Sequence, residues 1–411
     1  MAKKQTSQLQ RIRSIRIKII GLGGGGSSIV SEMSQRLPGV SFVAADTDLV
    51  NLQRIKNNHL ALFSFGSEAT CGLGTGMNSN LGRKIAQSST ESIKQLFSDV
   101  DLFILISCLG GGIGSGALPI FAKAAQDSQA LGIGVLTMPF SFEGSKRQRL
   151  AQKSLKEIAP YLDARMVLAN EKIFSVAGDQ ASFSAALSLI NQSLIDNLNA
   201  LIEIIRQPGL INIDFSDLKA ILHGRNQTVF LNSATEQGEK RLEKVLDKIN
   251  RYDFYYNEPM PADKILLHLV GGTDLKMSEV QTISQKIKDP NPDAQIIFGV
   301  DRKPGFKTQM KITLLSINAD KGRKEKKTSP VDKKTTKNKK AVKKVNKNKA
   351  NTPKSSKKDK KTSQSKTNSS KQKKKVKRLN ALDVKEMKKK SEFQKTSQEK
   401  IWDIPAFLRR K

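Results

Sequence analysis

The stretch LFILISCLGGGIGSGALPIFAKAA, residues 102–125, decides the fold of this 411-residue chain. It opens with LFILIS, a short apolar run typical of a strand buried on both faces. GGGIGSG (110–116) follows with five glycines and a serine, and ALPIFAKAA then has helical composition. A glycine-rich turn at the carboxyl end of a strand exposes N–H groups that bind anionic oxygens. No lysine lies in the turn, which excludes the GxxxxGK[ST] phosphate loop.

A second glycine-rich turn, GLGGGGSS (21–28), also follows a strand-like segment and opens a helix. Gly21, Gly23 and Gly26 fit the GxGxxG pattern of dinucleotide sites, in which a pyrophosphate lies at a helix N-terminus. Asp46 follows the next strand, as an acidic partner for ribose would. Two such turns on neighbouring parallel strands predict a site for one long phosphate chain.

Two more segments belong to the same predicted site. TCGLGTGMN (70–78) leads into another helix, and PFSFEGSKRQR (139–149) follows the strand-like run GIGVLT. Within the latter, the Glu143 carboxylate is suited to accept hydrogen bonds from ribose hydroxyls. The Arg147 guanidinium is suited to bind ribose or phosphate.

Strand-like and helix-like segments alternate from residue 15 to about 168. The strand-like runs are residues 15–20, 41–45, 102–107, 132–137 and 165–169. This alternation predicts a parallel sheet covered by helices on both faces. A long helix is expected at 181–205, and further strands are expected at 265–270, 295–300 and 310–317.

The sequence therefore predicts an α/β protein with five parts. They are a Rossmann-like parallel-sheet domain (11–180), a long central helix (181–207), a second α+β domain (208–318), a disordered basic linker (319–398) and a C-terminal docking peptide (399–411).

The charge of the chain is concentrated in the linker. The formal net charge is +33, and 26 basic but only three acidic residues lie from Lys321 to Arg378. Such a segment has too few apolar residues to fold. We expect it to bind polyanions nonspecifically, with an affinity that falls steeply with salt. The two cysteines, Cys71 and Cys108, and the lack of a membrane-length apolar stretch predict a cytoplasmic protein.

The chain ends in a short amphipathic segment, DIPAFLRR (403–410). Asp403 is a suitable N-cap for a helix. Ile404, Phe407 and Leu408 would share one face of that helix. The segment therefore predicts a docking peptide that lies in the groove of a partner protein.

In this order, the motifs resemble the tubulin/FtsZ superfamily of GTPases. The matching segments are GLGGGGSS, ADTD (45–48), CGLGTGMN, GGGIGSG, PFSFEG, VLAN (167–170), GLINIDFSDL (209–218) and DIPAFLRR. The resemblance covers residues 15–318 and the last dozen residues. The terminal segment narrows it to the FtsZ branch.

The resemblance implies that the site binds GTP together with Mg²⁺, with Asn170 reading guanine. The nucleotide-binding residues expected from it and from the loops are Gly23, Gly24, Gly25, Gly26, Ser27, Ser28, Asp46, Gly74, Gly110, Gly111, Gly112, Ile113, Gly114, Ser115, Gly116, Glu143, Arg147, Asn170 and Gln192. No metal site made of protein ligands alone is expected, because His59, His223 and His268 lie far apart in the sequence.

The resemblance also implies how the protein assembles. Subunits would join head-to-tail into filaments of a division ring at midcell. Asn212, Asp214 and Asp217, in the loop 209–217, would complete the site of the next subunit and promote hydrolysis. Asp403–Arg410 would bind a membrane-tethering division protein of the FtsA or SepF type.

Three alternatives remain open from the sequence. Ile113 stands where the family usually has threonine, and Asn191 or Gln192 stands where it has an acidic residue on the long helix. The chain could therefore be a GTP-binding polymer with little hydrolysis. The first glycine turn with Asp46 or Asp48 also fits an NAD-type oxidoreductase. Finally, Asp214 or Ser216 before LKAIL is a reasonable helix N-cap.

Overall fold

The computed structural model describes residues 14–319 apart from 179, 208, 258 and 260. The predictions for the linker beyond residue 319 and for the docking peptide lie outside the described residues. A parallel sheet forms the first part of the described chain, with strand order β3-β2-β1-β4-β5-β6. Its strands are β1 (Ile17–Leu22), β2 (Ser41–Asp46), β3 (Leu60–Ser64), β4 (Leu102–Cys108), β5 (Leu131–Met138) and β6 (Ala164–Ala169).

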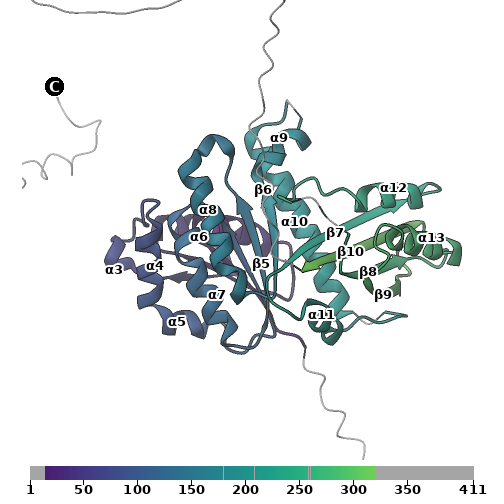
Figure 1. Cartoon of the computed structure of the whole chain (residues 1–411), viewed down its shortest axis with the longest axis horizontal. Coiled ribbons are helices and arrows are strands. Elements are labelled where there is room, and N and C mark those ends of the chain that lie inside the picture. Colours follow the sequence, from purple (N-terminus) through teal and green to yellow (C-terminus); the bar gives the residue numbers. More distant parts are fainter. Residues whose placement is uncertain (1–13, 179, 208, 258, 260, 320–411) are drawn as a thin grey trace, which may run out of the picture. The chain divides into compact units, whose positions relative to one another are not determined.

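The predicted α/β fold is confirmed, because helices cover both faces of this sheet (Figure 1). One face packs against α1 (Gly23–Ser34), α2 (Leu49–Arg54) and α10 (Phe183–Arg206). The other packs against α4 (Ser79–Ser88), α5 (Thr90–Gln95), α7 (Leu118–Gln126) and α8 (Ser145–Ile158). The short helices are α3 (Ser67–Thr70), α6 (Gly112–Gly116) and α9 (Ile173–Val176), with 3₁₀ turns at Ser141–Glu143, Ala159–Tyr161 and Asn170–Lys172.

The long central helix α10 begins after Ser182, whose side chain accepts a hydrogen bond from the N–H of Ala185 at 3.2 Å. It ends at Arg206, before Pro208 and Gly209. Its 24 residues give a length of about 36 Å at 1.5 Å per residue. Figure 1 shows α9 and α11 (Phe215–Leu222) near opposite ends of this helix.

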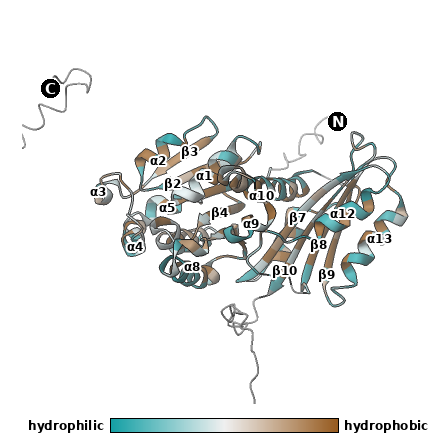
Figure 2. Cartoon of the chain, turned by 90° about the horizontal axis from the view of Figure 1, so that it is seen from above, coloured by the Kyte–Doolittle hydropathy of each residue, from teal (hydrophilic) through white to brown (hydrophobic). Residues whose placement is uncertain are grey.

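The second group of strands joins the first in one sheet. Its elements are β7 (Gln227–Gln237), α12 (Arg241–Ile249), β8 (Lys264–Gly271), α13 (Met277–Lys288), β9 (Gln295–Arg302) and β10 (Gln309–Ala319). β10 pairs antiparallel with β7 and β8, whereas β8 and β9 are parallel. Only two residue pairs, Ala164 with Gln227 and Arg165 with Thr228, connect β6 to β7. Figure 2 shows α12 and α13 along one face of this second group.

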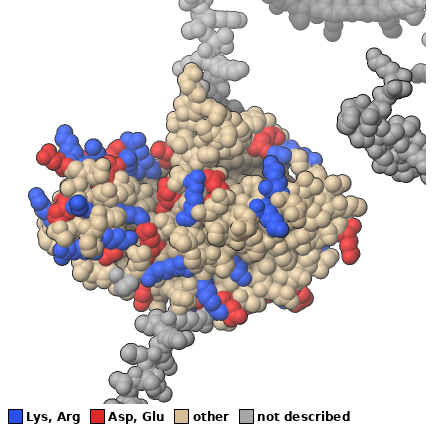
Figure 3. Space-filling model, turned by 180° about the vertical axis from the view of Figure 1, so that it is seen from behind, with Lys and Arg blue, Asp and Glu red and all other residues tan. Residues whose placement is uncertain are grey.

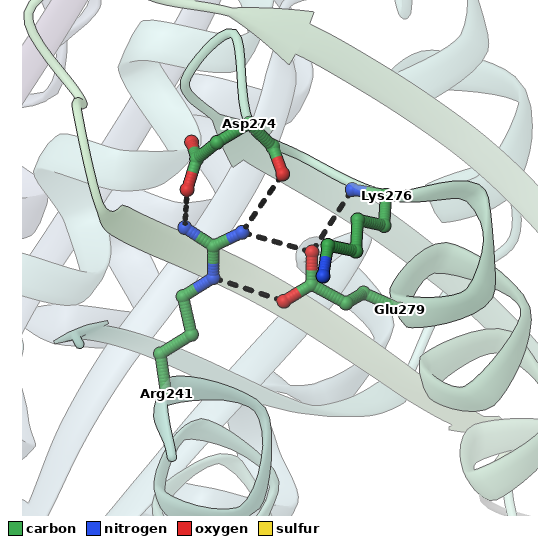
Figure 4. A network of polar contacts seen from close by, with 4 residues as sticks. All are labelled: Arg241, Asp274, Lys276 and Glu279. Carbon is green, nitrogen blue, oxygen red and sulfur yellow. Dashed lines mark hydrogen bonds and ion pairs between the residues drawn. The ribbon is translucent and has the colours of Figure 1, made fainter. Parts of the chain in front are cut away.

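A buried arginine holds α12 against α13 (Figure 4). The Arg241 side chain donates to both carboxylate oxygens of Glu279, at 2.9 and 2.8 Å, and to the carboxylate of Asp274 at 2.5 Å. Glu279 also accepts the backbone N–H of Lys276 at 2.9 Å. The hydrogen bond with Glu279 raises the pKa of Arg241. Every buried charge here therefore has a partner, as a stable interior requires.

His268, on β8, is buried near a mixed set of charges. Only 8% of the residue is exposed, and the charged groups around it are Asp301, Lys311, Lys303 and Glu203. Burial lowers the pKa of His268 to about 4. The folded protein therefore holds this imidazole neutral at pH values where the unfolded chain already protonates it.

We expect this burial to make the protein less stable in mild acid. Above pH 6.5 the imidazole is neutral in both states, so it has no effect. Between pH 6.5 and about 4 only the unfolded chain binds the proton, and the free energy of unfolding falls by up to about 3 kcal/mol. Urea unfolding of wild type and His268→Asn at pH 7.5 and 4.5 measures the difference. The exposed His59→Asn is the control, and equal pH dependence in all three proteins would contradict the prediction.

Among the described residues, no helix combines the length and apolar character needed to span a bilayer. On the face drawn in Figure 3, Lys and Arg side chains are interspersed with Asp and Glu rather than gathered in one patch.

Candidate functional site

A cleft of about 510 Å³ lies where the parallel strands β1, β2, β4, β5 and β6 end. The predicted residues that line it are Gly23, Gly24, Gly25, Asp46, Gly74, Gly111, Gly112, Ile113, Gly114, Glu143, Arg147 and Asn170. The carboxyl ends of parallel strands are the usual ligand site of such sheets. The structure thus brings together residues from all the predicted loops.

The glycine turn at residues 21–28 places the N-terminus of α1 at this cleft. The helix begins at Gly23, directly after β1, and no side chain caps its first turn. Its free N–H groups and the helix dipole favour an anion there. Gly21 and Gly26 have another role. A Cβ at Gly21 would collide with the backbone of Gly26, and one at Gly26 with the carbonyl of Ile106. These two glycines allow close packing of α1 on the sheet.

The glycine turn at residues 110–116 exposes the backbone of Gly111 to the cleft. Gly111 is extended, with φ −96° and ψ 177°, and a Cβ there would meet no atom within 4 Å. By contrast, a Cβ at Gly112 would collide with Thr75, and one at Gly114 with the carbonyl of Cys108. Glycine at these two positions therefore lets the turn lie this close to its neighbours.

Six predicted residues support the turns without lining the cleft. They are Gly26, Ser27, Ser28, Gly110, Ser115 and Gly116. The Ser27 hydroxyl donates to the Gly21 carbonyl at 3.2 Å, and the buried Ser115 hydroxyl accepts the N–H of Gly110 at 2.8 Å. Their side chains hold the loop backbone in shape.

Glu143 and Arg147 form an ion pair within the cleft wall. Glu143 also accepts the backbone N–H of Phe140 at 2.8 Å, and an Arg147 nitrogen lies 3.2 Å from the sulfur of Met77. Both side chains are therefore positioned by neighbours. Asn170 lies directly after β6, at the same edge of the sheet.

Asp46 is the most buried acid of the cleft, with 4% of the residue exposed. It accepts the N–H of Thr47 at 2.8 Å and an amide N–H of Asn51 at 3.3 Å. Burial raises its pKa above the ordinary value. Asp48 also lines the cleft and caps α2 by accepting the N–H of Asn51 at 2.9 Å. One or two carboxylates beside phosphate oxygens are the ligands that Mg²⁺ takes.

The sequence did not predict several other residues of the cleft wall. They are Leu22, Asn51, Leu73, Thr75, Gly76, Met77, Cys108, Leu109 and Pro139. Asn51 could have been found from the sequence. Asp48 before LVNLQR is typical of a helix N-cap, and an N-cap accepts the N–H of the residue three positions later, which is Asn51. Leu73 and Met77 lie in the predicted segment 70–78 but were not singled out in it, and Leu109 carries no local signal of a ligand site.

A cluster of aromatic rings lies around Phe140, in the segment 139–149. Phe140 stacks on Phe142 with centroids 4.9 Å apart, and Phe174 and Phe183 lie 5.7 and 5.8 Å from Phe140. Phe142 is 67% exposed, and Phe174 and Phe183 are each 54% exposed. Phe140 follows Pro139 and Phe142 precedes Glu143 in the sequence, and Pro139 and Glu143 both line the cleft. The cluster is therefore next to the cleft wall in the sequence.

The structure does not bring Gln192 into this cleft. Its amide oxygen accepts from Arg36, just after the end of α1, and its amide nitrogen donates to Asp196 one turn further along α10 at 2.7 Å. The neighbouring Asn191 donates to Glu32 of α1 at 2.9 Å. Both side chains join the two helices.

Asn212, Asp214 and Asp217 lie beyond the far end of α10 and do not line the cleft. Asp214 is the N-cap of α11. Its carboxylate accepts the N–H of Asp217 at 2.9 Å, while Asp217 accepts the N–H of Asp214 at 3.0 Å. Asn212 accepts the N–H of Gly209 at 3.3 Å. The capping alternative is thus realised, and it leaves one carboxylate oxygen of each aspartate outside the cap.

Two uncapped glycine turns at the ends of parallel strands define a nucleotide-binding protein with a Rossmann-like domain. Residues 16–178 match the model of the Tubulin/FtsZ family, GTPase domain. The chain is 32% identical over 288 residues to the mitochondrial division protein fszB of Dictyostelium discoideum, an alignment that covers 69% of this chain and 78% of the relative.

Two further comparisons agree. FtsZ of Rickettsia conorii is 31% identical over 312 residues, with 74% of this chain and 68% of the relative covered. The empty FtsZ dimer of M. jannaschii matches with a TM-score of 0.65 and 27% identity, over 75% of this chain and 89% of that one. This chain belongs to the tubulin/FtsZ family, and it is a GTPase. The family, fold and enzyme class predicted from the sequence are confirmed.

Proposed function

We propose that this GTPase polymerises head-to-tail into filaments that act in cell division, and that GTP is hydrolysed between subunits. The supporting observation is that the loop 209–217, which follows the long helix α10, does not line the cleft. The helix α10, about 36 Å long, separates them. In this proposal the Asp214 and Asp217 carboxylates act on a nucleotide bound by another subunit, since neither residue lines the cleft of its own subunit.

Exposed apolar side chains near the cleft and on the loop 209–217 support contacts between subunits. Near the cleft, Leu73 is 75% and Val50 69% exposed, and Met77 is 55% exposed. On the loop, Leu210 is 71% and Ile211 50% exposed. Apolar groups gathered around two complementary surfaces are typical of protein interfaces. A second copy of the chain would bury both sets.

In this proposal the glycine turns hold the phosphates of GTP, Glu143 and Arg147 hold the ribose, and Asn170 reads guanine. Mg²⁺ would be held by the phosphates with Asp46 or Asp48. Among the described residues no cluster of three ligand side chains could hold it alone. Asn212, Asp214 and Asp217 would position and polarise the attacking water, because phosphoryl transfer needs mainly positioning and charge placement.

Ile113 favours slow GTP hydrolysis. Its side chain lines the cleft, is 5% exposed and carries no hydroxyl to contact a phosphate. The oxidoreductase alternative loses its support, because the comparisons match a GTPase family instead.

The remaining parts of the proposal concern segments beyond residue 319. The lysine-rich linker would act as a spacer and contact polyanions nonspecifically. Asp403–Arg410 would bind a membrane-tethering division protein of the FtsA or SepF type. The protein would then work in the cytoplasm at the midcell ring.

We expect assembly to require GTP and to persist without the tail. Light scattering of the full chain should rise with GTP and stay flat with GDP. A chain truncated after Ala319 retains the cleft and the loop, so its filaments should remain visible by negative-stain microscopy. Loss of filaments on truncation, in low salt, would place the lysine-rich linker in the polymer contact. Equal scattering with GTP and GDP would contradict the proposed function.

A further inference from the structure

The loop after α10 is anchored along the strand β9, which is the last strand in the order of the sheet. The Ile211 N–H donates to the Val300 carbonyl at 3.0 Å, and the Val300 N–H donates to the Ile211 carbonyl at 3.1 Å. These two bonds form an antiparallel bridge on the side of β9 that faces away from β8. The edge strand therefore satisfies backbone groups of the loop that would otherwise need other partners.

A second anchor lies two residues further along the loop, where Ile213 packs on Gly299 of β9. Ile213 is only 3% exposed. A Cβ at Gly299 would lie 2.6 Å from Cδ1 and 2.7 Å from Cγ1 of Ile213. It would also lie 3.0 Å from Cδ2 of His268, which is paired with Gly299 in the register of β8 and β9. This close contact between the loop and the strand therefore requires a residue without a side chain at position 299.

The start of the loop approaches β9 equally closely. A Cβ at Gly209 would lie 2.9 Å from the Val300 carbonyl oxygen, which already accepts the Ile211 N–H. The Gly209 N–H donates to the Asn212 side chain at 3.3 Å, so the loop also closes on itself. Two glycines, one on the loop and one on the strand, thus allow the loop to lie directly on the edge of the sheet.

These contacts hold Asp214 between two fixed parts of the chain. Before it is the anchored Ile213, and after it is α11, whose Leu218 and Leu222 are fully buried. The capping bond from the Asp217 N–H fixes the Asp214 carboxylate at the start of this helix. The position of the carboxylate relative to the sheet therefore depends on how closely Ile213 packs on β9.

From these contacts we propose that β9 is the template that positions the Asp214 carboxylate for the nucleotide of the next subunit, with Gly299 as a positioning residue that acts through Ile213. The role of β9 rests on the proposed function, because it concerns hydrolysis completed between subunits. An ordinary carbon–carbon contact is about 3.5 to 4.0 Å long, so a methyl group at residue 299 displaces Ile213 by about 1 Å. A displacement of about 1 Å at a positioned group can lower a rate by about 100-fold.

The first test is Gly299→Ala in the full chain. Phosphate release, divided by the amount of protein that sediments with GTP, should fall by about 10- to 100-fold. The GTP affinity of the unassembled subunit should stay at the wild-type value, because Gly299 does not line the nucleotide cleft. Gly305→Ala is the matched control, since a Cβ there meets no atom within 4 Å. Both values should equal those of wild type in the control.

A second-site variant tests whether the alanine acts through Ile213. Ile213→Val removes Cδ1, the atom nearest to the added methyl group. In the Gly299→Ala background it should restore most of the lost rate, whereas alone it should change the rate little. An alanine that acted elsewhere, for example on His268, would gain nothing from this change, because the loss of a buried methyl group by itself weakens the core.

A folded Gly299→Ala protein with wild-type phosphate release would overturn the proposal. So would a double variant that is no faster than Gly299→Ala alone. If Gly299→Ala does not fold, Gly209→Ala tests the same point from the loop, because its Cβ presses on the Val300 carbonyl and should slow phosphate release in the same way.

Asp214→Asn in the same assay separates this proposal from the proposed function. Wild-type phosphate release by Asp214→Asn would remove the role of the loop in hydrolysis, and the role of β9 with it. Slow release by Asp214→Asn, together with wild-type release by both Gly299→Ala and Gly209→Ala, would overturn the role of β9 alone.

Discussion

Gly111→Trp should abolish GTP binding and leave the fold intact. A Cβ at Gly111 meets no atom within 4 Å, and the backbone there is extended, so any residue can adopt its conformation. The indole then occupies the cleft of about 510 Å³ in place of the phosphates. We expect GTP affinity to fall by at least about 100-fold, or about 2.7 kcal/mol. Titration with a fluorescent GTP analogue measures the loss, and circular dichroism checks the fold.

Gly305→Trp is the matched control. A Cβ at Gly305 also meets no atom within 4 Å, but Gly305 does not line the cleft. Its GTP affinity should equal that of wild type. A folded Gly111→Trp protein with wild-type affinity would show that GTP binds elsewhere. Gly112→Trp is less informative, because its Cβ collides with Thr75 and the variant is expected to lose the turn itself.

Asp214→Asn should separate the capping role of this residue from its proposed catalytic role. Asparagine is as good an N-cap as aspartate, so the bond from the Asp217 N–H is kept and thermal stability should stay near wild type. The negative charge is lost. Phosphate release should therefore fall by about 10² to 10³ relative to wild type, the usual contribution of one such group. GTP affinity of the isolated subunit should not change, since Asp214 does not line the cleft. A folded variant with wild-type hydrolysis would leave Asp214 only its capping role.

Mixing the two variants tests whether the site is shared. The Gly111→Trp subunit has an intact loop, and the Asp214→Asn subunit has an intact cleft. At one face of a mixed pair the two intact parts meet, so phosphate release should recover above that of either variant alone, at equal total protein. No recovery, with both proteins folded and able to co-assemble, would place hydrolysis within one subunit.

Most strands of the first domain could be predicted because their signals are local, although β3 (Leu60–Ser64) was missed. LFILIS is apolar at nearly every position, and β4 indeed pairs on both sides, with β1 and β5. The strand β7 could not be predicted in this way. Its Asn232 and Ser233 interrupt the apolar pattern. The Asn232 amide donates to the carbonyls of Ile249 and Arg251, and the Ser233 hydroxyl bonds the hydroxyl of Thr313, which is distant in the sequence.

The nucleotide cleft was predictable in its loops but less so in its individual residues. The spacing of glycines marks a turn, yet it does not distinguish Gly24, which lines the cleft, from Gly26, which allows close packing on Ile106. The placement of Gln192 depends on the rotation of α10 about its axis. The sequence of a long helix does not say which neighbour each of its faces meets. The contact between Gln192 and Arg36 is therefore known only from the structure.

The length of α10 also has a stoichiometric consequence. If the loop after α10 completes the cleft of the next subunit, a row of subunits would have one fewer completed site than it has bound nucleotides. In the proposed filament the subunit at one tip would keep its GTP, because no neighbour supplies the carboxylates. The rate of GTP hydrolysis per subunit would thus be lower in short oligomers than in long ones. The lifetime of a filament would then be tied to its size through the geometry of a single helix.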